Sequence, residues 1–118
     1  MFTVDLKNSR CLHYGINVHL LKPETIVLVV TKNNLYKIIK GDEDKHDAFV
    51  QGGKLFPELK RIKFTGSTFG GSMLKIGWIG KEMLMELYSI EEKKLYRTSE
   101  VVAARVVGDG WEYDMDWE

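Results

Sequence analysis

The end of the chain alternates strictly between large apolar and acidic side chains. From residue 111 to residue 118 the order is Trp-Glu-Tyr-Asp-Met-Asp-Trp-Glu. Successive side chains of an extended strand point to opposite faces, so one face would carry three aromatic rings and a methionine, and the other four carboxylates. A helix would scatter the acids around its axis. The sequence therefore predicts a half-buried terminal strand whose charged face discourages unwanted strand addition.

Other apolar segments repeat the features of strands. The run at 26–30 is continuous and β-branched, as expected for a strand buried on both faces, and Asn33-Asn34 is a credible tight turn after it. Acids at the start of 42–51 and two glycines after it are typical of a short helix. Strands are expected at residues 2–7, 16–21, 26–31, 35–40, 73–78, 83–88, 95–98, 101–107 and 111–118.

These elements predict one mainly β domain over residues 1–118, of the β-rich α+β class. We expect a single small curled sheet or partly open barrel of about six to eight mostly antiparallel strands. One short helix near residues 42–51 would pack on it. A β-sandwich is the alternative architecture.

Charge and composition restrict the partners and the compartment. Seventeen basic and seventeen acidic residues give no net charge, which argues against a general nucleic-acid binder and does little to prevent self-association. The longest apolar run is far shorter than the ~20 residues that span a bilayer. The single Cys11 and the lack of a signal-peptide pattern favour the cytoplasm. Three tryptophans fit an oligomer interface, so we expect a homo-oligomer.

The segment most typical of a binding site is a loop expected at 65–72. Glycines let backbone N–H groups turn towards one anion, hydroxyls donate to phosphate oxygens, and an aromatic ring stacks on a base. An ordinary wide turn, with its hydroxyls bonded within the loop, is the alternative. The segment consists of Thr65, Gly66, Ser67, Thr68, Phe69, Gly70, Gly71 and Ser72.

Cations and one further ring complete this candidate site. Lys75 supplies charge near the loop, and Trp78 is a second candidate for stacking. Arg97 and Arg105 are expected on two late strands, where a guanidinium can bind phosphate bidentately. They would approach each other if the two strands are neighbours. Pairing of each arginine with a nearby carboxylate is the simpler alternative.

Signals for a metal site or for catalysis are weak. Cys11, His13 and His19 provide only part of a zinc ligand set, and the acids of the terminal strand lie along a line instead of converging on one point. A Cys-His pair lacks a third orienting group. We therefore predict no metal, no cofactor and no catalytic residue.

One short segment resembles a known family. Residues 76–85, Ile-Gly-Trp-Ile-Gly-Lys-Glu-Met-Leu-Met, resemble the Gly-Trp-x-Gly-Lys-x-Met run of small phage proteins that sequester signalling nucleotides. The similarity covers about ten of the 118 residues, and a glycine-hydroxyl loop replaces the amphipathic helix that the family carries upstream. The resemblance implies nucleotide capture without catalysis, with Trp78 stacking on the base.

These features lead to hypotheses from different classes. The first is a non-enzymatic domain that binds an anionic small molecule, in particular a nucleotide or signalling nucleotide. The second is a protein-interaction or assembly module, or an inhibitor, encoded by a phage or another mobile element. A third is a small barrel that binds nucleic acid through aromatic side chains, against which the neutral charge counts.

Overall fold

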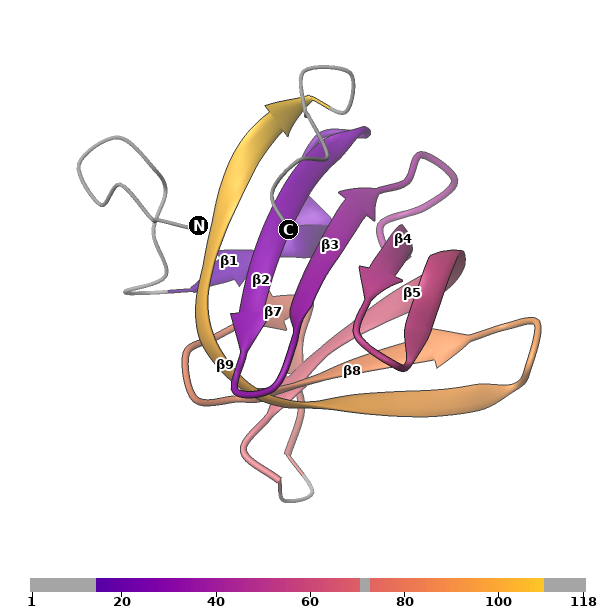
Figure 1. Cartoon of the computed structure of the whole chain (residues 1–118). Helices are drawn as coiled ribbons and strands as arrows, with labels where there is room; N and C mark the ends of the chain where they lie inside the picture. Colours follow the sequence, from indigo (N-terminus) through magenta and orange to yellow (C-terminus); the bar gives the residue numbers. More distant parts are fainter. Residues whose placement is uncertain (1–14, 71–72, 110–118) are drawn as a thin grey trace.

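The regular structure of the protein is almost entirely β-strand. The computed structural model describes residues 15–70 and 73–109 (Figure 1). Within these ranges a single 3-10 turn is the sole helical element, and no helix is long and apolar enough to cross a membrane. The strands expected at 2–7 and 111–118 lie outside the described residues.

The elements follow one another along the chain with short connections. In order they are β1 Ile16–Asn17, the 3-10 turn η1 Val18–Leu20, β2 Thr25–Thr31, β3 Leu35–Lys40, β4 Asp47–Gly52, β5 Phe56–Thr68, β6 Lys75–Ile76, β7 Trp78–Ile79, β8 Leu84–Ser89 and β9 Lys94–Asp109.

Seven strands form one antiparallel sheet in the order β4-β3-β2-β9-β8-β5-β6. Strand β4 also pairs with β5, so the sheet is partly closed without becoming a barrel. The long strand β9 makes this curvature possible, because its first part pairs with β8 and its second part with β2 (Figure 1). Strands β1 and β7 form a separate two-stranded sheet. The predicted curled, mainly antiparallel β architecture is confirmed.

The core lies inside the curve of this sheet. Alternate side chains of β3, β4 and the second half of β5 point inwards, as period-two patterning requires. Strand β2 is also buried on its other face, at Ile26 and Leu28, which confirms the interpretation of its continuous apolar run. The inner cluster includes Val27, Val29, Tyr36, Ile38, Ala48, Val50, Phe56, Ile62, Phe64, Met85, Leu87 and Ala104.

The prediction of a helix near residues 42–51 is wrong, because a turn and then β4, from Asp47 onwards, occupy that segment. Ala48 and Val50 are buried while Phe49 and Gln51 are partly exposed, which is the alternation of a strand. Gly52 is needed for close strand packing and does not cap a helix. A Cβ there would lie 2.2 Å from the carbonyl oxygen of Leu35 on β3. Pairing on both sides, with β3 and with β5, outweighs the helical end signals.

Three strand boundaries also differ from expectation. The strand expected at 16–21 stops after two residues and continues as η1. The segments 95–98 and 101–107 belong to the single strand β9, which is bent by a register shift opposite Leu84 and Glu86. The strand expected at 73–78 is divided at Gly77 into β6 and β7.

Candidate ligand-binding site

Half of the expected loop at 65–72 is strand. Thr65, Gly66, Ser67 and Thr68 form the end of β5, and only Phe69 and Gly70 bend away from it. Gly71 and Ser72 lie outside the described residues. The loop interpretation is therefore wrong for its first four residues.

The hydroxyl groups in this segment bind the protein itself. Thr65 Oγ1 donates to the carbonyl oxygen of Glu86 at 2.7 Å, and Ser67 Oγ donates to that of Trp78 at 2.5 Å. Thr68 Oγ1 accepts a hydrogen bond from the Gly70 N–H at 3.2 Å. The bond between Thr68 and Gly70 is of the kind that the alternative, an ordinary turn, requires, whereas Thr65 and Ser67 bind the neighbouring strands β8 and β7.

Gly66 has a structural role in the sheet. It lies at a register shift between β5 and β8, and it is also paired with Ile76 of β6. Its φ is +152°, and a Cβ there would lie only 2.2 Å from the carbonyl oxygen of Lys75. A residue without a side chain is therefore required so that β6 can approach β5 at this bulge.

Arg97 and Arg105 do not converge. Both lie on β9, eight residues apart, which corresponds to roughly 26 Å along an extended strand. Arg97 donates from Nε and Nη2 to Glu86 Oε2, at 3.0 and 2.5 Å. Arg105 lies opposite Leu28 of β2. The simpler alternative, pairing with a carboxylate, therefore describes Arg97.

The structure does bring Lys75 and Trp78 together, but their side chains contact each other. The Lys75 ammonium lies 3.9 Å from the centre of the Trp78 ring, a cation–π contact. The indole also packs on backbone, since a Cβ on Gly15 would lie 2.1 Å from Trp78 Cζ2 and one on Gly80 2.7 Å from Nε1. Trp78 is therefore less available for stacking on a ligand than the sequence suggests.

Phe69, in contrast, is exposed beside a surface hollow. Its side chain is 74% exposed, although it lies directly after the buried end of β5. The hollow has a volume of about 520 Å³, and the buried Val101 of β9 forms part of its base. We call it the Phe69 hollow; its lining residues are Lys32, Phe69, Lys81, Glu82, Glu100, Val101 and Val102.

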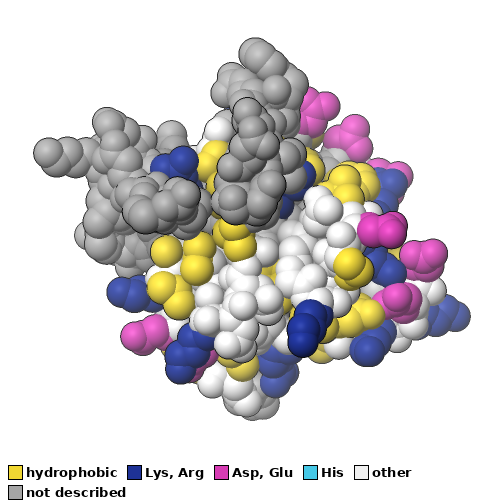
Figure 2. Space-filling view, viewed as in Figure 1, with side chains coloured by type: hydrophobic (Ala, Val, Ile, Leu, Met, Phe, Trp, Pro, Cys, Tyr) yellow, Lys and Arg dark blue, Asp and Glu magenta, His cyan; other side chains and the backbone are white. Residues whose placement is uncertain are grey.

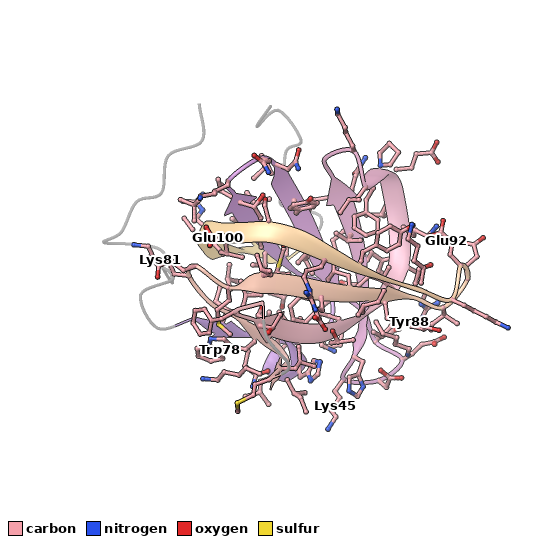
Figure 3. All side chains as sticks on the ribbon, turned by 90° about the horizontal axis from the view of Figure 1, so that it is seen from below. Lys45, Trp78, Lys81, Tyr88, Glu92 and Glu100 are labelled. Carbon is pink, nitrogen blue, oxygen red and sulfur yellow. The ribbon has the colours of Figure 1, made fainter. Side chains whose placement is uncertain are left out.

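The charged groups of the Phe69 hollow differ in how they are paired. Lys32 Nζ lies 3.2 Å from Glu100 Oε1, and both side chains are well exposed. Within residues 15–70 and 73–109, the side chains of Lys81 and Glu82 have no ion-pair or hydrogen-bond partner. Figure 3 shows Lys81 and Glu100 at the same end of the β8–β9 ribbon, opposite the end that carries Glu92.

The backbone fixes the turn that presents Lys81 and Glu82. Glu82 has a φ of +70°, which is uncommon for a residue with a side chain, and its N–H donates to the carbonyl oxygen of Val101 at 2.7 Å. In return, the Val101 N–H donates to Met83. The turn is thereby tied to β9, and a strained conformation held in this way is often associated with function.

Sequence reasoning identified only Phe69 among the residues of this hollow. Lys32, Glu100 and Val102 come from β2–β3 and β9, and only the curling of the sheet brings these elements to the β7–β8 turn. The Gly80-Lys81-Glu82 sequence is a recognisable turn signal, but nothing in it indicates a neighbouring aromatic ring.

Comparison with known proteins adds no constraint to the site. No protein-family model, no curated protein and no solved structure matches the chain. Among the described residues, no group of three or more histidine, cysteine, aspartate or glutamate side chains is arranged to hold a metal ion. Cys11 and His13 lie outside those residues.

Proposed function

We propose that this protein is a non-enzymatic domain that binds a planar, anionic small molecule, such as a nucleotide, in the Phe69 hollow. The observation that carries the proposal is an exposed aromatic ring beside a lysine that has no partner within the described part of the chain. The loop backbone, which the sequence suggested as the phosphate site, has a smaller part in this proposal.

The chemistry of the Phe69 hollow fits such a ligand. The Phe69 ring can stack on a base, and stacking of this kind is worth roughly 1–3 kcal/mol. Within the described part of the chain Lys81 has no ion pair that would have to break before it could neutralise a phosphate. Lys32 can join it at small cost, because an exposed pair such as Lys32–Glu100 contributes only about 0–1 kcal/mol.

Size and shape support the same class of ligand. The volume of about 520 Å³ lies within the roughly 300–1,000 Å³ typical of small-molecule sites. Val101 and Val102 give the hollow an apolar lining that suits a flat apolar group, and the other lining residues besides Phe69 are charged. Figure 2 shows basic and acidic side chains interspersed along the right-hand side of the visible face, a distribution that favours a small ligand over a long polyanion.

The test is a thermal-shift series with guanosine monophosphate, adenosine monophosphate and inorganic phosphate. A ligand present at about 100 times its Kd should add about 2.7 kcal/mol of stability. The proposal expects a nucleotide to raise Tm in the wild type and in Phe69→Tyr, and expects Phe69→Ala and Lys81→Glu to remove the shift.

Two matched variants act as controls. Leu20→Ala removes an equally exposed apolar side chain elsewhere, and Lys54→Glu makes the same charge change on another exposed lysine. Both should keep the shift. A wild type that responds to neither nucleotide, or a loss of response in the controls as large as in the site variants, contradicts the proposal.

A second candidate function, self-assembly, has its own supporting observation. The β5–β6 hairpin exposes several large apolar side chains: Phe69, Met73, Leu74 and Ile76. Strand β6 is also the last strand of the sheet order, so its outer edge has no strand partner among the described residues. Exposed apolar groups on an open edge favour association with a second copy of the chain.

Sedimentation velocity distinguishes the two candidates. If the hairpin is an interface, the wild type sediments as an oligomer, and Met73→Lys or Ile76→Lys shifts it towards the monomer. Lys81→Glu should leave this equilibrium unchanged, because Lys81 lies outside the hairpin. A wild type that is monomeric at high concentration would exclude this second function.

A further inference from the structure

Two histidines that are distant in sequence are in direct contact. His19 belongs to η1, and His46 belongs to the turn between β3 and β4. Their ring centres are 4.5 Å apart, with the planes inclined by 74°, an edge-to-face arrangement. The contact joins the small β1–β7 side of the molecule to the β3–β4 turn of the main sheet.

Hydrogen bonding fixes the tautomer of His19. Its Nε2 lies 2.8 Å from the carbonyl oxygen of Phe64 on β5. A carbonyl group can only accept, so Nε2 carries the hydrogen and the neutral ring has no hydrogen on Nδ1. Nδ1 faces the backbone at Gly77, where a Cβ would lie 2.8 Å away. Protonation would therefore place a charge on the packed side of the ring.

The backbone of His46 is tied to the same residue of β5. The Phe64 N–H donates to the His46 carbonyl oxygen at 2.8 Å, so Phe64 binds both histidines through its own backbone. The His46 N–H donates to Asp44 Oδ1 at 2.8 Å, which holds the turn in place. The His19 ring cannot move far without breaking its hydrogen bond to Phe64, whereas the bonds of His46 fix the backbone from which its ring projects.

The charged groups around the pair are mostly positive. Lys40 of β3 and Lys45 of the turn act on His19, and Lys63 of β5 lies on the His46 side. Among the described residues the acid in contact with the pair is Asp44, whose Oδ1 lies 3.8 Å from His46 Nδ1. Its other oxygen, Oδ2, already accepts from Lys63 Nζ at 2.7 Å. Figure 3 shows Lys45 at the lower margin of the molecule in that view.

We propose that the His19–His46 contact is an acid-sensitive connection, which holds η1 against the β3–β4 turn while both rings are neutral and releases η1 when both are protonated. Two imidazolium rings in contact would repel each other, and Lys40 and Lys45 would add to that repulsion. The proposal is independent of any ligand in the Phe69 hollow.

The direction of the pH effect follows from the environment of His19. Burial lowers the pKa of His19 below its ordinary value of 6.5; the hydrogen bond to Phe64 opposes this, and the charges of His46, Lys45 and Lys40 reinforce it. The unfolded chain therefore binds the proton more readily than the folded one. The stability that the contact contributes to the fold is therefore complete above pH 6.5. It is lost as the pH falls through the lower pKa that His19 has in the folded protein.

Release of η1 would also affect strands β7 and β1. The Val18 N–H donates to the carbonyl oxygen of Gly77 at 2.7 Å, directly before β7. Strand β1 pairs with β7 at Ile16–Ile79 and Asn17–Trp78. Acid should therefore loosen the β1–β7 sheet before it affects the core of the main sheet.

The test is an NMR titration of the full-length protein that follows the histidine ring protons. The proposal expects the midpoint of His19 to lie below 6.5 and to rise in His46→Gln. Lys45→Gln, at an exposed position of the turn, should raise it as well without any change in packing. A midpoint at or above 6.5, or one that neither substitution moves, overturns the proposal.

Hydrogen exchange supplies a second, local measurement. Corrected for intrinsic rates, protection of the Val18 amide should fall between about pH 7.5 and pH 5.5 while that of the buried Val29 persists. His46→Gln should show no such selective loss. Equal protection of Val18 at both pH values, or a joint loss at Val18 and Val29, would refute selective release of η1.

Discussion

Asp47 organises the turn that replaces the expected helix. Its side chain is 1% exposed and accepts hydrogen bonds from Arg61 Nε and Nη2, each at 2.9 Å. The Glu43 N–H donates to the same carboxylate at 3.2 Å. A buried carboxylate with this many donors stabilises the fold only while all of them remain in place.

Removing this carboxylate should be costly. We expect Asp47→Ala to lower the free energy of unfolding by about 2–3 kcal/mol, because hydrogen bonds to charged groups are lost and the Glu43 N–H is left without its acceptor. Glu100→Ala, which breaks the exposed pair with Lys32, should cost less than about 1 kcal/mol. Urea denaturation measures both, and equal costs would show that burial of Asp47 is unimportant.

The pKa of Asp47 predicts how acid affects the free energy of unfolding. The hydrogen bonds from Arg61 hold the pKa of Asp47 below its ordinary value of 3.8. The folded state thus binds a proton on Asp47 less readily than the unfolded chain does. The stability that the ionised Asp47 contributes is present above pH 3.8 and is lost as the pH falls through the lower pKa of Asp47 in the folded protein. In Asp47→Asn that part of the acid dependence should disappear; an unchanged profile in urea melts below pH 4 would contradict the assignment.

At the scale of the element, period-two patterning predicted most strands. Strands β2 and β3, with the turn at Asn33-Asn34, follow the sequence closely, since Val30 pairs with Leu35. The prediction of a helix near 42–51 failed because acidic residues of this segment have partners on β5: Asp47 binds Arg61 and Asp44 binds Lys63. No local signal could reveal those partners. The same holds for the join of 95–98 and 101–107 into β9, which depends on its two neighbours.

Gly66 offers a test of the β5–β6 junction. We expect Gly66→Ala to destabilise the protein by about 1–3 kcal/mol, because the new Cβ adopts a strained φ and meets the Lys75 carbonyl oxygen. Gly70→Ala is the matched control, with a positive φ of 99° but, among the described residues, its nearest contact to the new Cβ at 3.9 Å, from Leu84. Thermal denaturation that ranks Gly70→Ala as equal or worse would argue against a clash at the junction.

For the whole molecule, the decisive feature is the closure of the sheet by distant segments. Strand β9 pairs with β2 over Thr25–Asp109, Ile26–Gly108 and further positions, so the last described strand lies beside the first long strand of the chain. The Phe69 hollow forms where pairing with β8 places β9 beside the β7–β8 turn and pairing with β2 adds Lys32. Sequence patterning could predict the strands, and even Phe69, but not which turns would become neighbours.

Such a topology should fold slowly for its size. Strands that are distant in sequence can pair only after the chain between them has closed into a loop, and the entropy lost in that closure precedes the stabilising contacts. We therefore expect refolding on the scale of roughly milliseconds to seconds. Stopped-flow fluorescence measures this rate. Refolding within microseconds would mean that local contacts dominate, in conflict with the β2–β9 and β4–β5 pairings.

Binding in the Phe69 hollow is tested most directly by NMR mapping of a guanosine monophosphate or adenosine monophosphate titration on the intact protein. We predict saturable shifts at the amides of Phe69, Lys81, Glu82, Val101 and Val102, and unchanged amides around the separate hollow at Leu59 and Lys60. No shift with either nucleotide, or shifts that leave the residues of the Phe69 hollow unaffected, would contradict the account.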